Sequence, residues 1–251
     1  MHAIPGLSVV VPLLNEEKNV EPLVQEIHTN VGPRARVYEI ILVNDGSQDR
    51  TGAMCDALSR RDARVRVVHH EKNRGYGAAL RSGFHASCQP YIFTTDGDLQ
   101  FDMAEIGRLL QLLEGADIVM GYRAHRMDPA HRRVNATVYK QVMRRLFGVT
   151  QKDLDCAFKI YRRDSLEALT LVSDGILISG EILMRAMRQG FVIREVAVSH
   201  YPRTHGRQTG NHPRVVATAM VELARLWRAS RQQESVARQT TAAGSGGGAG
   251  S

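Results

Sequence analysis

The chain has 251 residues, a hydrophobic share of 43% and a formal net charge of +7. A chain of this kind can bury a sizeable core, as one large α/β domain or two small ones. It has no run of about 18 apolar residues, so no membrane-spanning helix is predicted. The positive charge indicates an anionic partner: a nucleotide, a lipid phosphate, a membrane surface or nucleic acid.

Predicted strands and helices alternate through the first half of the chain. Short apolar and β-branched runs are typical of strands buried on both faces of a parallel sheet, and a helical pattern follows each run. This alternation predicts an open α/β sheet, mostly parallel, with helices on both faces. The expected strands are Leu7–Pro12, Tyr38–Val43, Val65–His69, a run from Tyr91, and Asp117–Met120.

The second half of the chain has a less regular pattern. Apolar residues at core spacing predict a helix around Ile182–Met187, which Gly190 is expected to end. A last helix is expected from Pro213, with one apolar stripe that includes Met220, Leu223, Leu226 and Trp227 and packs on the sheet. The other expected features are strands at Cys156–Tyr161 and Phe191–Val198, a basic loop at His125–Arg133 and a polar loop at Tyr201–Gly210.

We expect a cytosolic protein. The N-terminus lacks the basic and apolar regions of a secretion signal. The three cysteines, Cys55, Cys88 and Cys156, are odd in number and have no CxxC spacing, which favours reduced thiols over a disulfide framework or a zinc site. Residues 233–251 are expected to form a disordered tail, because they end in a stretch of Gly, Ala, Ser and Thr.

Polar residues follow each of the predicted strands. The C-terminal ends of parallel strands lie along one edge of a sheet, and α/β sheets bind their ligands at that edge. A ligand site is therefore predicted there. The clusters expected at the edge are Asn15-Glu16, Asp45, Asn73-Arg74, Asp96 with Asp98, and Arg123.

The cluster Asp96-Gly97-Asp98 carries two carboxylates separated by one residue. If strand geometry continues through Asp98, residues i and i+2 point to one face, so both carboxylates and Gln100 aim at one point. Gly97 has no Cβ, which lets a ligand approach the backbone. Paired carboxylates repel each other unless a cation lies between them, and Mg²⁺ is typically held by one or two carboxylates plus phosphate oxygens. The structural alternative is an Asp-Gly turn with two solvated acids.

No dinucleotide-binding motif follows the first strand: where GxGxxG is expected, the chain has Pro12-Leu13-Leu14-Asn15-Glu16. The chain instead resembles the family 2 nucleotide-sugar glycosyltransferases with the GT-A fold, over about its first half. The form Asp-x-Asp-x-Gln, followed by Gly121-Tyr122-Arg123, is similar to the dolichol/polyprenol-phosphate mannosyltransferase branch. The motifs that carry the resemblance are Val10–Glu16, Val43–Ser47, Asn73–Ala79 and Thr95–Gln100.

The resemblance implies a role for each matching position. The nucleotide-sugar pocket would consist of Pro12, Leu13, Asn15, Glu16, Asp45, Asn73 and Asp96, with Asp45 accepting a hydrogen bond from the base. Mg²⁺ or Mn²⁺ would be bound by Asp96, Asp98 and Gln100. The donor diphosphate or the acceptor phosphate would meet Arg123, Arg133, Arg203 and Arg207. The candidate catalytic residues are Asp96, Asp98 and Asp155.

The resemblance implies an inverting, metal-dependent glycosyltransferase. A hexose, mannose or glucose, would pass from GDP-mannose or a UDP-hexose to a polyprenyl or dolichyl phosphate, with peripheral contact to the inner face of the membrane. We expect one domain over residues 1–232, divided into a nucleotide-sugar half (1–122) and an acceptor half (123–232).

The acceptor class stays open at this stage. The chain departs from the family pattern at Cys156-Ala157-Phe158 and at Gln208-Thr209. An ionised lipid phosphate needs no general base, whereas a soluble hydroxyl acceptor requires a carboxylate base, Asp155 or Glu181.

Structural roles and other function classes are the alternatives. Asn15 could cap a helix, Asp155 could form an ion pair and Glu181 could be structural, while His69 and His70 lack metal-ligand spacing. A basic nucleic-acid-binding module would explain the charge, but not the acidic clusters or the scarcity of aromatics among the arginines. A non-catalytic partner subunit is disfavoured because Asp96, Asp98 and Gln100 are all present.

Overall fold

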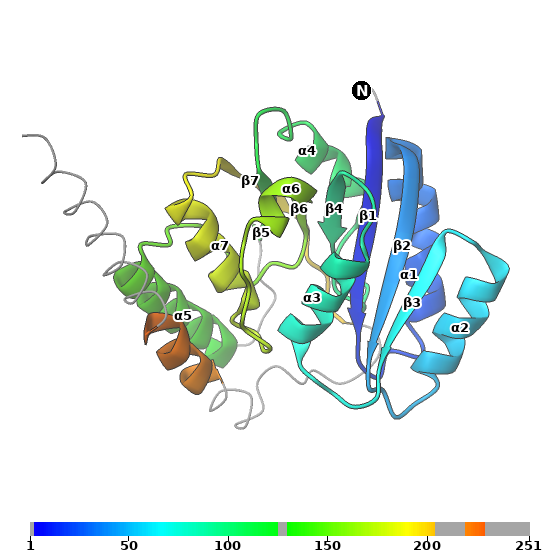
Figure 1. Cartoon of the computed structure of the whole chain (residues 1–251), viewed down its shortest axis with the longest axis horizontal. Helices are drawn as coiled ribbons and strands as arrows, with labels where there is room; N and C mark the ends of the chain where they lie inside the picture. The colour runs from blue at the N-terminus through cyan, green and yellow to red at the C-terminus, as the bar shows by residue number, and fades with distance from the viewer. Residues whose placement is uncertain (1–2, 125–129, 204–218, 229–251) are drawn as a thin grey trace, which may run out of the picture.

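A seven-stranded sheet forms the centre of the protein, in the order β3-β2-β1-β4-β6-β5-β7 (Figure 1). The computed structural model describes residues 3–124, 130–203 and 219–228, and only the backbone of residues 130–136. The strands are β1 (Ile4–Leu13), β2 (Ala35–Asp45), β3 (Val65–His70), β4 (Tyr91–Thr94), β5 (Ile118–Arg123), β6 (Lys159–Arg162) and β7 (Ile193–Val198).

The sheet is mostly parallel, as expected. Of the described strands, only β6 runs antiparallel to its neighbours, between β4 and β5. Residues 6–11 of β1 and 39–45 of β2 are buried, because helices cover both faces of these strands. The C-terminal ends of β1 to β5 therefore share one edge, and the polar clusters at the ends of these strands lie along it.

Helices cover the sheet in two layers, and the alternation along β1 shows why. Val9 and Val11 join a core with the helices α1, α2 and α4, whereas Val10 packs with α3 and α7 on the other face. The α-helices are α1 (Val20–Glu26), α2 (Thr51–Arg61), α3 (Tyr76–Ala86), α4 (Ile106–Leu110), α5 (Ala130–Phe147), α6 (Arg163–Glu167) and α7 (Ile178–Arg188), with a π-helical turn at Ile27–Val31 and 3₁₀ turns at Gly32–Arg34 and Met103–Glu105.

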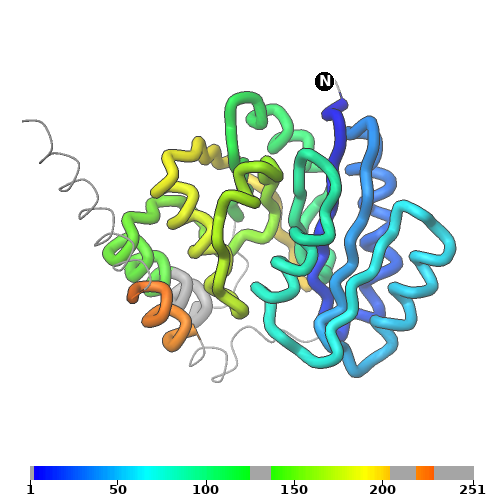
Figure 2. Tube along the Cα trace, in the orientation of Figure 1, coloured from blue at the N-terminus to red at the C-terminus, as the bar shows by residue number. Residues whose placement is uncertain are grey.

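The second half of the chain adds a third apolar cluster around α5 and α7. These two helices lie side by side at one end of the molecule (Figure 2). Residues 219–228 are helical, and their Leu223 and Leu226 pack into this cluster with Met143 and Met184. The helix thus packs on α5 and α7, where packing on the sheet was expected. Met220 and Trp227 do not belong to its buried stripe, since they are 62% and 38% exposed.

Several boundaries differ from the expected ones. β4 ends at Thr94, so strand geometry does not continue through Asp98, and β6 begins only at Lys159. The first helix begins at Val20, which leaves Asn15 in a loop instead of at a helix start. The tail 233–251 lies outside the described residues. None of the described helices combines the length and the hydropathy needed to cross a bilayer.

Candidate active site

The Asp96-Gly97-Asp98 turn lies at the C-terminal edge of the sheet, directly after β4. Tyr76, the first residue of α3, donates its hydroxyl to Asp96 Oδ1 at 3.0 Å. Burial, followed by the charge of Asp98, raises the pKa of Asp96 to about 7, although Tyr76, Arg123 and Lys159 act in the opposite direction. The charge of Asp98 thus adds to the effect of burial, and a bound cation would offset both.

Gly97 is needed for packing in this structure. A Cβ atom on Gly97 would lie 2.4 Å from Leu13 Cδ2 and 3.3 Å from the carbonyl oxygen of Pro12. The turn therefore rests directly on the end of β1, which brings the carboxylates to the predicted nucleotide pocket. The sequence analysis expected the missing Cβ to make room for a ligand. In the structure this space is occupied by the side chain of Leu13.

Arg203 connects two predicted site residues that are far apart in the sequence. Its guanidinium forms an ion pair with Glu16 and lies 3.7 Å from Asp98 Oδ2. Glu16 is 8% exposed and also accepts a hydrogen bond from Asn19 Nδ2 at 2.6 Å. Burial raises the pKa of Glu16, and the Asn19 hydrogen bond and the Arg203 charge offset part of that effect.

Gln100 holds the segment that carries Arg203. Its side-chain amide donates to the carbonyl of Tyr201 at 2.8 Å, and the Tyr201 amide donates to the Gln100 carbonyl at 2.8 Å. This tether brings the residues after β7 to the carboxylate turn. Metal ligation by Gln100 stays a prediction.

Asp45 is a hub of protein hydrogen bonds. Oδ1 accepts from His70 Nδ1 at 2.6 Å and from the Arg74 amide at 2.8 Å, and Oδ2 accepts from the Gly75 amide at 2.9 Å. The sequence pattern did not show these contacts, because His70 looked like an ordinary polar residue. Recognition of the base by Asp45 remains a prediction.

The remaining predicted pocket residues take different positions. Asn15 has a positive φ of 56°, accepts from the Gln48 amide at 2.8 Å and so joins the loops after β1 and β2. Leu13 is buried, Pro12 is half-buried and Asn73 is exposed. The Arg133 side chain and Arg207 lie outside the described residues.

Arg123 is held rigidly by an acid that the sequence analysis missed. Asp153 Oδ2 accepts from Arg123 Nε at 2.6 Å, and Oδ1 accepts from Nη2 at 2.8 Å. Both side chains are nearly buried, with exposed fractions of 11% for Arg123 and 7% for Asp153. Asp155, two residues later, is exposed. Both acids lie in one loop, so sequence alone offered no signal to choose between them.

The two candidate bases differ in their surroundings. Glu181 is fully buried and accepts from the Ser173 amide at 2.8 Å and from Arg185 Nε at 2.7 Å, so it has a structural role. Asp155 lines a small pocket of about 160 Å³ together with Lys140 and Lys152. Of the two, only Asp155 is accessible to an acceptor.

Lys159 is a further buried charged residue, and the sequence pattern had indicated no role for it. It is 1% exposed, and its Nζ donates to the carbonyl of Leu154 at 3.0 Å. Burial lowers the pKa of Lys159, while the nearby charges of Asp155, Asp153 and Asp96 raise it. This lysine adds positive potential beneath the carboxylate turn.

The residues present fit a divalent cation that also binds phosphate oxygens. Among the residues that the structure describes, no group of three or more His, Cys, Asp or Glu side chains could enclose a metal ion. Mg²⁺ is usually held by one or two carboxylates plus substrate phosphates, which matches Asp96 and Asp98. Burial, followed by the charge of Asp98, disfavours the ionised form of Asp96, and a cation bound between the carboxylates would offset both effects.

We expect the titration of Asp96 to make the metal-free protein less stable as the pH rises. Folding raises the pKa of this carboxyl from 3.8 to about 7, so the folded chain binds the proton more tightly. The stabilisation is complete below the lower value and is lost as the pH passes through the higher one, at up to about 1.4 kcal/mol per pH unit. Urea unfolding at several pH values should show this slope in the wild type and a flatter one in Asp96→Asn. Equal slopes would contradict the prediction.

Comparison with known proteins identifies the family of this chain. Residues 8–170 match the family described as Glycosyl transferase family 2. The undecaprenyl-phosphate 4-deoxy-4-formamido-L-arabinose transferase of Pseudomonas aeruginosa (strain LESB58) is 34% identical over 82% of this chain and 60% of the relative. The dodecaprenyl-phosphate galacturonate synthase of Rhizobium johnstonii is 33% identical over 80% of this chain and 60% of the relative. The chain thus spans about 60% of the length of these curated relatives.

A solved structure shares the fold. Glucosyl-3-phosphoglycerate synthase of Mycobacterium tuberculosis, crystallised with Mn²⁺, UDP and phosphoglyceric acid, has a TM-score of 0.67 and 22% identity, covering 87% of this chain and 78% of that chain. The expected GT-A architecture is therefore confirmed. With the match over residues 8–170 and relatives above 30% identity, this chain belongs to glycosyl transferase family 2.

Proposed function

We propose that the protein transfers a sugar from a nucleotide-diphosphate sugar to a polyprenyl phosphate, with Mg²⁺ or Mn²⁺ bound at Asp96 and Asp98. The observation that carries this proposal is the meeting of carboxylates and arginine at one sheet edge, where Arg203 lies 3.7 Å from Asp98. Two relatives named for transfer or synthesis on polyprenyl phosphates support the acceptor class.

The chemistry follows from charge placement. A bound cation acts as a Lewis acid that neutralises the charge developing on the leaving diphosphate. Asp153 holds the guanidinium of Arg123 in one orientation, so its charge is preorganised for a phosphate group. Positioning and electrostatics then supply the rate enhancement, because an acceptor phosphate is already ionised and needs no general base. The saturated hydrogen bonds of Glu181 agree with a reaction of this type.

The transfer assay should combine a broad donor panel with two acceptors. The panel includes GDP-mannose, UDP-glucose, and nucleotide-activated galacturonate and 4-deoxy-4-formamido-L-arabinose, because the relatives' names extend beyond the hexoses expected from the sequence. Metal-dependent transfer to undecaprenyl phosphate supports the proposal. Transfer to soluble hydroxyl acceptors alone would contradict the proposal. If Asp155→Asn abolished that transfer, the enzyme would use a hydroxyl acceptor with Asp155 as the general base.

We also propose that the chain contacts anionic membrane through the surface formed by α5 and residues 219–228. Arg144 and Arg145 on α5 and Arg225 and Arg228 on the last described helix are exposed. Trp227 beside them is 38% exposed. Each Lys or Arg close to an anionic surface contributes roughly 1 kcal/mol, so a few suffice for reversible binding.

Vesicle co-sedimentation checks this contact. Binding to phosphatidylglycerol vesicles should appear at low salt and weaken as salt is added. The triple variant Arg144→Gln/Arg145→Gln/Arg228→Gln should bind about a hundredfold more weakly, from three lost charges. The matched variant Arg36→Gln/Arg60→Gln/Arg61→Gln removes the same charge from other exposed positions and should bind like the wild type. Equal losses in both variants would mean that the net charge alone causes binding.

A further inference from the structure

A chain of hydrogen bonds, buried at its centre, leads from α3 through β3 and β2 toward the carboxylate turn. His70 ends β3 and is 7% exposed, with Nδ1 2.6 Å from Asp45 Oδ1 and Nε2 2.9 Å from Ser82 Oγ. Asp45 also accepts from two backbone amides, so it acts as an acceptor. Nδ1 of His70 therefore carries a proton and donates it to Asp45, while Nε2 shares a hydrogen bond with the Ser82 hydroxyl.

Asp45 transmits this arrangement to the loop between β3 and α3. Its carboxylate accepts from the amides of Arg74 and Gly75 at 2.8 and 2.9 Å. Gly75 has φ of 102°, and a Cβ there would lie 2.4 Å from the carbonyl oxygen of Asp174, so the loop is confined on both sides. Tyr76 follows immediately and donates to Asp96 at 3.0 Å.

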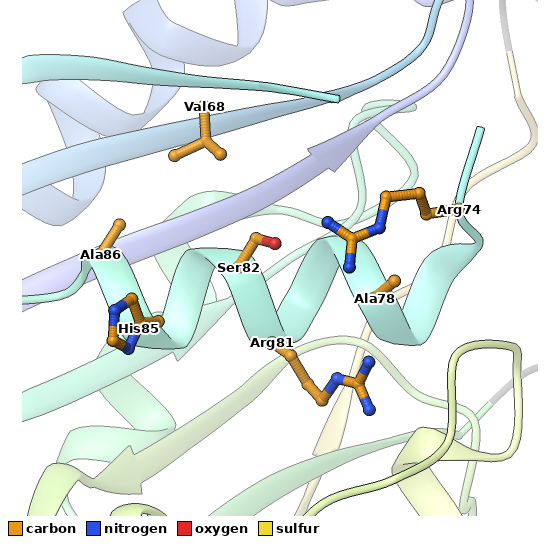
Figure 3. Close-up of a pocket in the computed structure, with 7 residues that line it drawn as sticks. All are labelled: Val68, Arg74, Ala78, Arg81, Ser82, His85 and Ala86. Carbon is orange, nitrogen blue, oxygen red and sulfur yellow. The ribbon is translucent and has the colours of Figure 1, made fainter. Parts of the chain in front are cut away.

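The same three side chains occur in serine hydrolases, but the surroundings here exclude that chemistry. Ser82 lies inside α3, where the backbone amides around it form helical hydrogen bonds and cannot stabilise an oxyanion. Figure 3 shows the Ser82 hydroxyl on the side of α3 that faces β3, within an open cavity of about 350 Å³ bordered by Arg74 and His85. The serine completes the hydrogen bonding of His70.

We propose that His70 is a positioning residue for donor binding. Through Asp45 it holds the loop Asn73–Tyr76, and through Tyr76 it orients the carboxylate of Asp96. The inference rests on the proposed function, because it assigns the loop to the nucleotide-diphosphate sugar. It adds a residue of the edge strand β3 that reaches the predicted nucleotide pocket through its contact with Asp45.

The first test measures the hydrogen bonds without any substrate. In ¹⁵N-histidine NMR spectra of the wild-type chain, Nδ1 of His70 should carry a proton, whereas the proton of neutral, solvent-exposed histidines lies mainly on Nε2. The His70 signal is assigned by its loss in His70→Asn. Ser82→Ala should shift the Nε2 resonance and leave the Nδ1 proton in place. An Nδ1 of His70 that carries no proton would overturn the proposal.

The second test uses two substitutions of similar polarity. The amide nitrogen of asparagine occupies the position of Nδ1 and can still donate to Asp45, whereas that of glutamine occupies the position of Nε2 and cannot. Calorimetry with UDP and GDP in the presence of Mn²⁺ should show about tenfold weaker binding in His70→Gln and a loss below about threefold in His70→Asn, the scale of one charge-assisted hydrogen bond. In steady-state kinetics with the sugar donor, His70→Gln should raise the KM for the donor more than it lowers kcat.

The matched control is His69→Gln. His69 precedes His70 on β3, faces the opposite side and bonds Asn44 and Asp56, so its variant should bind nucleotide like the wild type. Equal affinity in His70→Gln and His70→Asn would overturn the positioning role. A wild-type protein that binds neither UDP nor GDP would contradict the proposed function. The NMR measurement would still show whether His70 donates its Nδ1 proton to Asp45, because it needs no nucleotide.

Discussion

Replacing Asp98 with asparagine is expected to lower the rate of sugar transfer at least about a thousandfold, because a Lewis-acid cation contributes several kcal/mol to the transition state. The Asp98 side chain is 15% exposed and lies 3.7 Å from Arg203. The amide keeps the size of the side chain but removes the charge that attracts both the cation and the guanidinium. Direct Mn²⁺ binding, followed by electron paramagnetic resonance, should weaken in parallel.

The fold should survive this substitution. Asp98 Oδ1 accepts a long hydrogen bond, 3.3 Å from the Gln100 amide, and the residue lies in a turn outside the apolar clusters. The control is Asp102→Asn, which removes a nearby carboxylate whose role is to cap a 3₁₀ turn through the Ala104 amide at 2.9 Å. Asparagine caps almost as well as aspartate, so this variant should remain active. Wild-type transfer by Asp98→Asn in saturating Mn²⁺ would remove Asp98 from the site.

The substitution Asp153→Ala is expected to have the largest effect on stability, about 3–5 kcal/mol in the free energy of unfolding. It leaves the guanidinium of Arg123, which is only 11% exposed, without the carboxylate that binds it at 2.6 Å. Removal of one partner of a buried pair costs more than the pair contributes, because the other charge stays buried. Urea unfolding measures the loss.

Two further variants separate charge burial from function. Asp155→Ala removes an exposed acid from the same loop and should cost less than about 1 kcal/mol. The double variant Arg123→Met/Asp153→Leu should recover most of the stability, since apolar residues of similar volume can replace a buried pair. It should still fail in sugar transfer if Arg123 binds a phosphate group. A loss below about 1 kcal/mol in Asp153→Ala would show that Arg123 reaches solvent.

The layered architecture and the edge that holds the site could be predicted from local sequence patterns. Runs such as Val9–Val11 and Ile40–Val43 are apolar at consecutive positions, and only a strand covered on both faces buries every one of them. Because parallel strands end at one edge, the positions of Glu16, Asp45 and Asp96 along the edge followed from local pattern alone.

Which polar groups meet depends on the packing of the folded chain. The antiparallel insertion of β6 between β4 and β5 depends on pairing over long sequence distances, which no local pattern encodes. β4 ends at Thr94 and the turn bends at Gly97, where Leu13 packs against it. Arg203 reaches Glu16 across 187 positions, and Arg123 selects Asp153 over Asp155. Ion pairs and buried hydrogen bonds of this kind depend on geometry within a few ångströms, and packing of the whole chain sets that geometry.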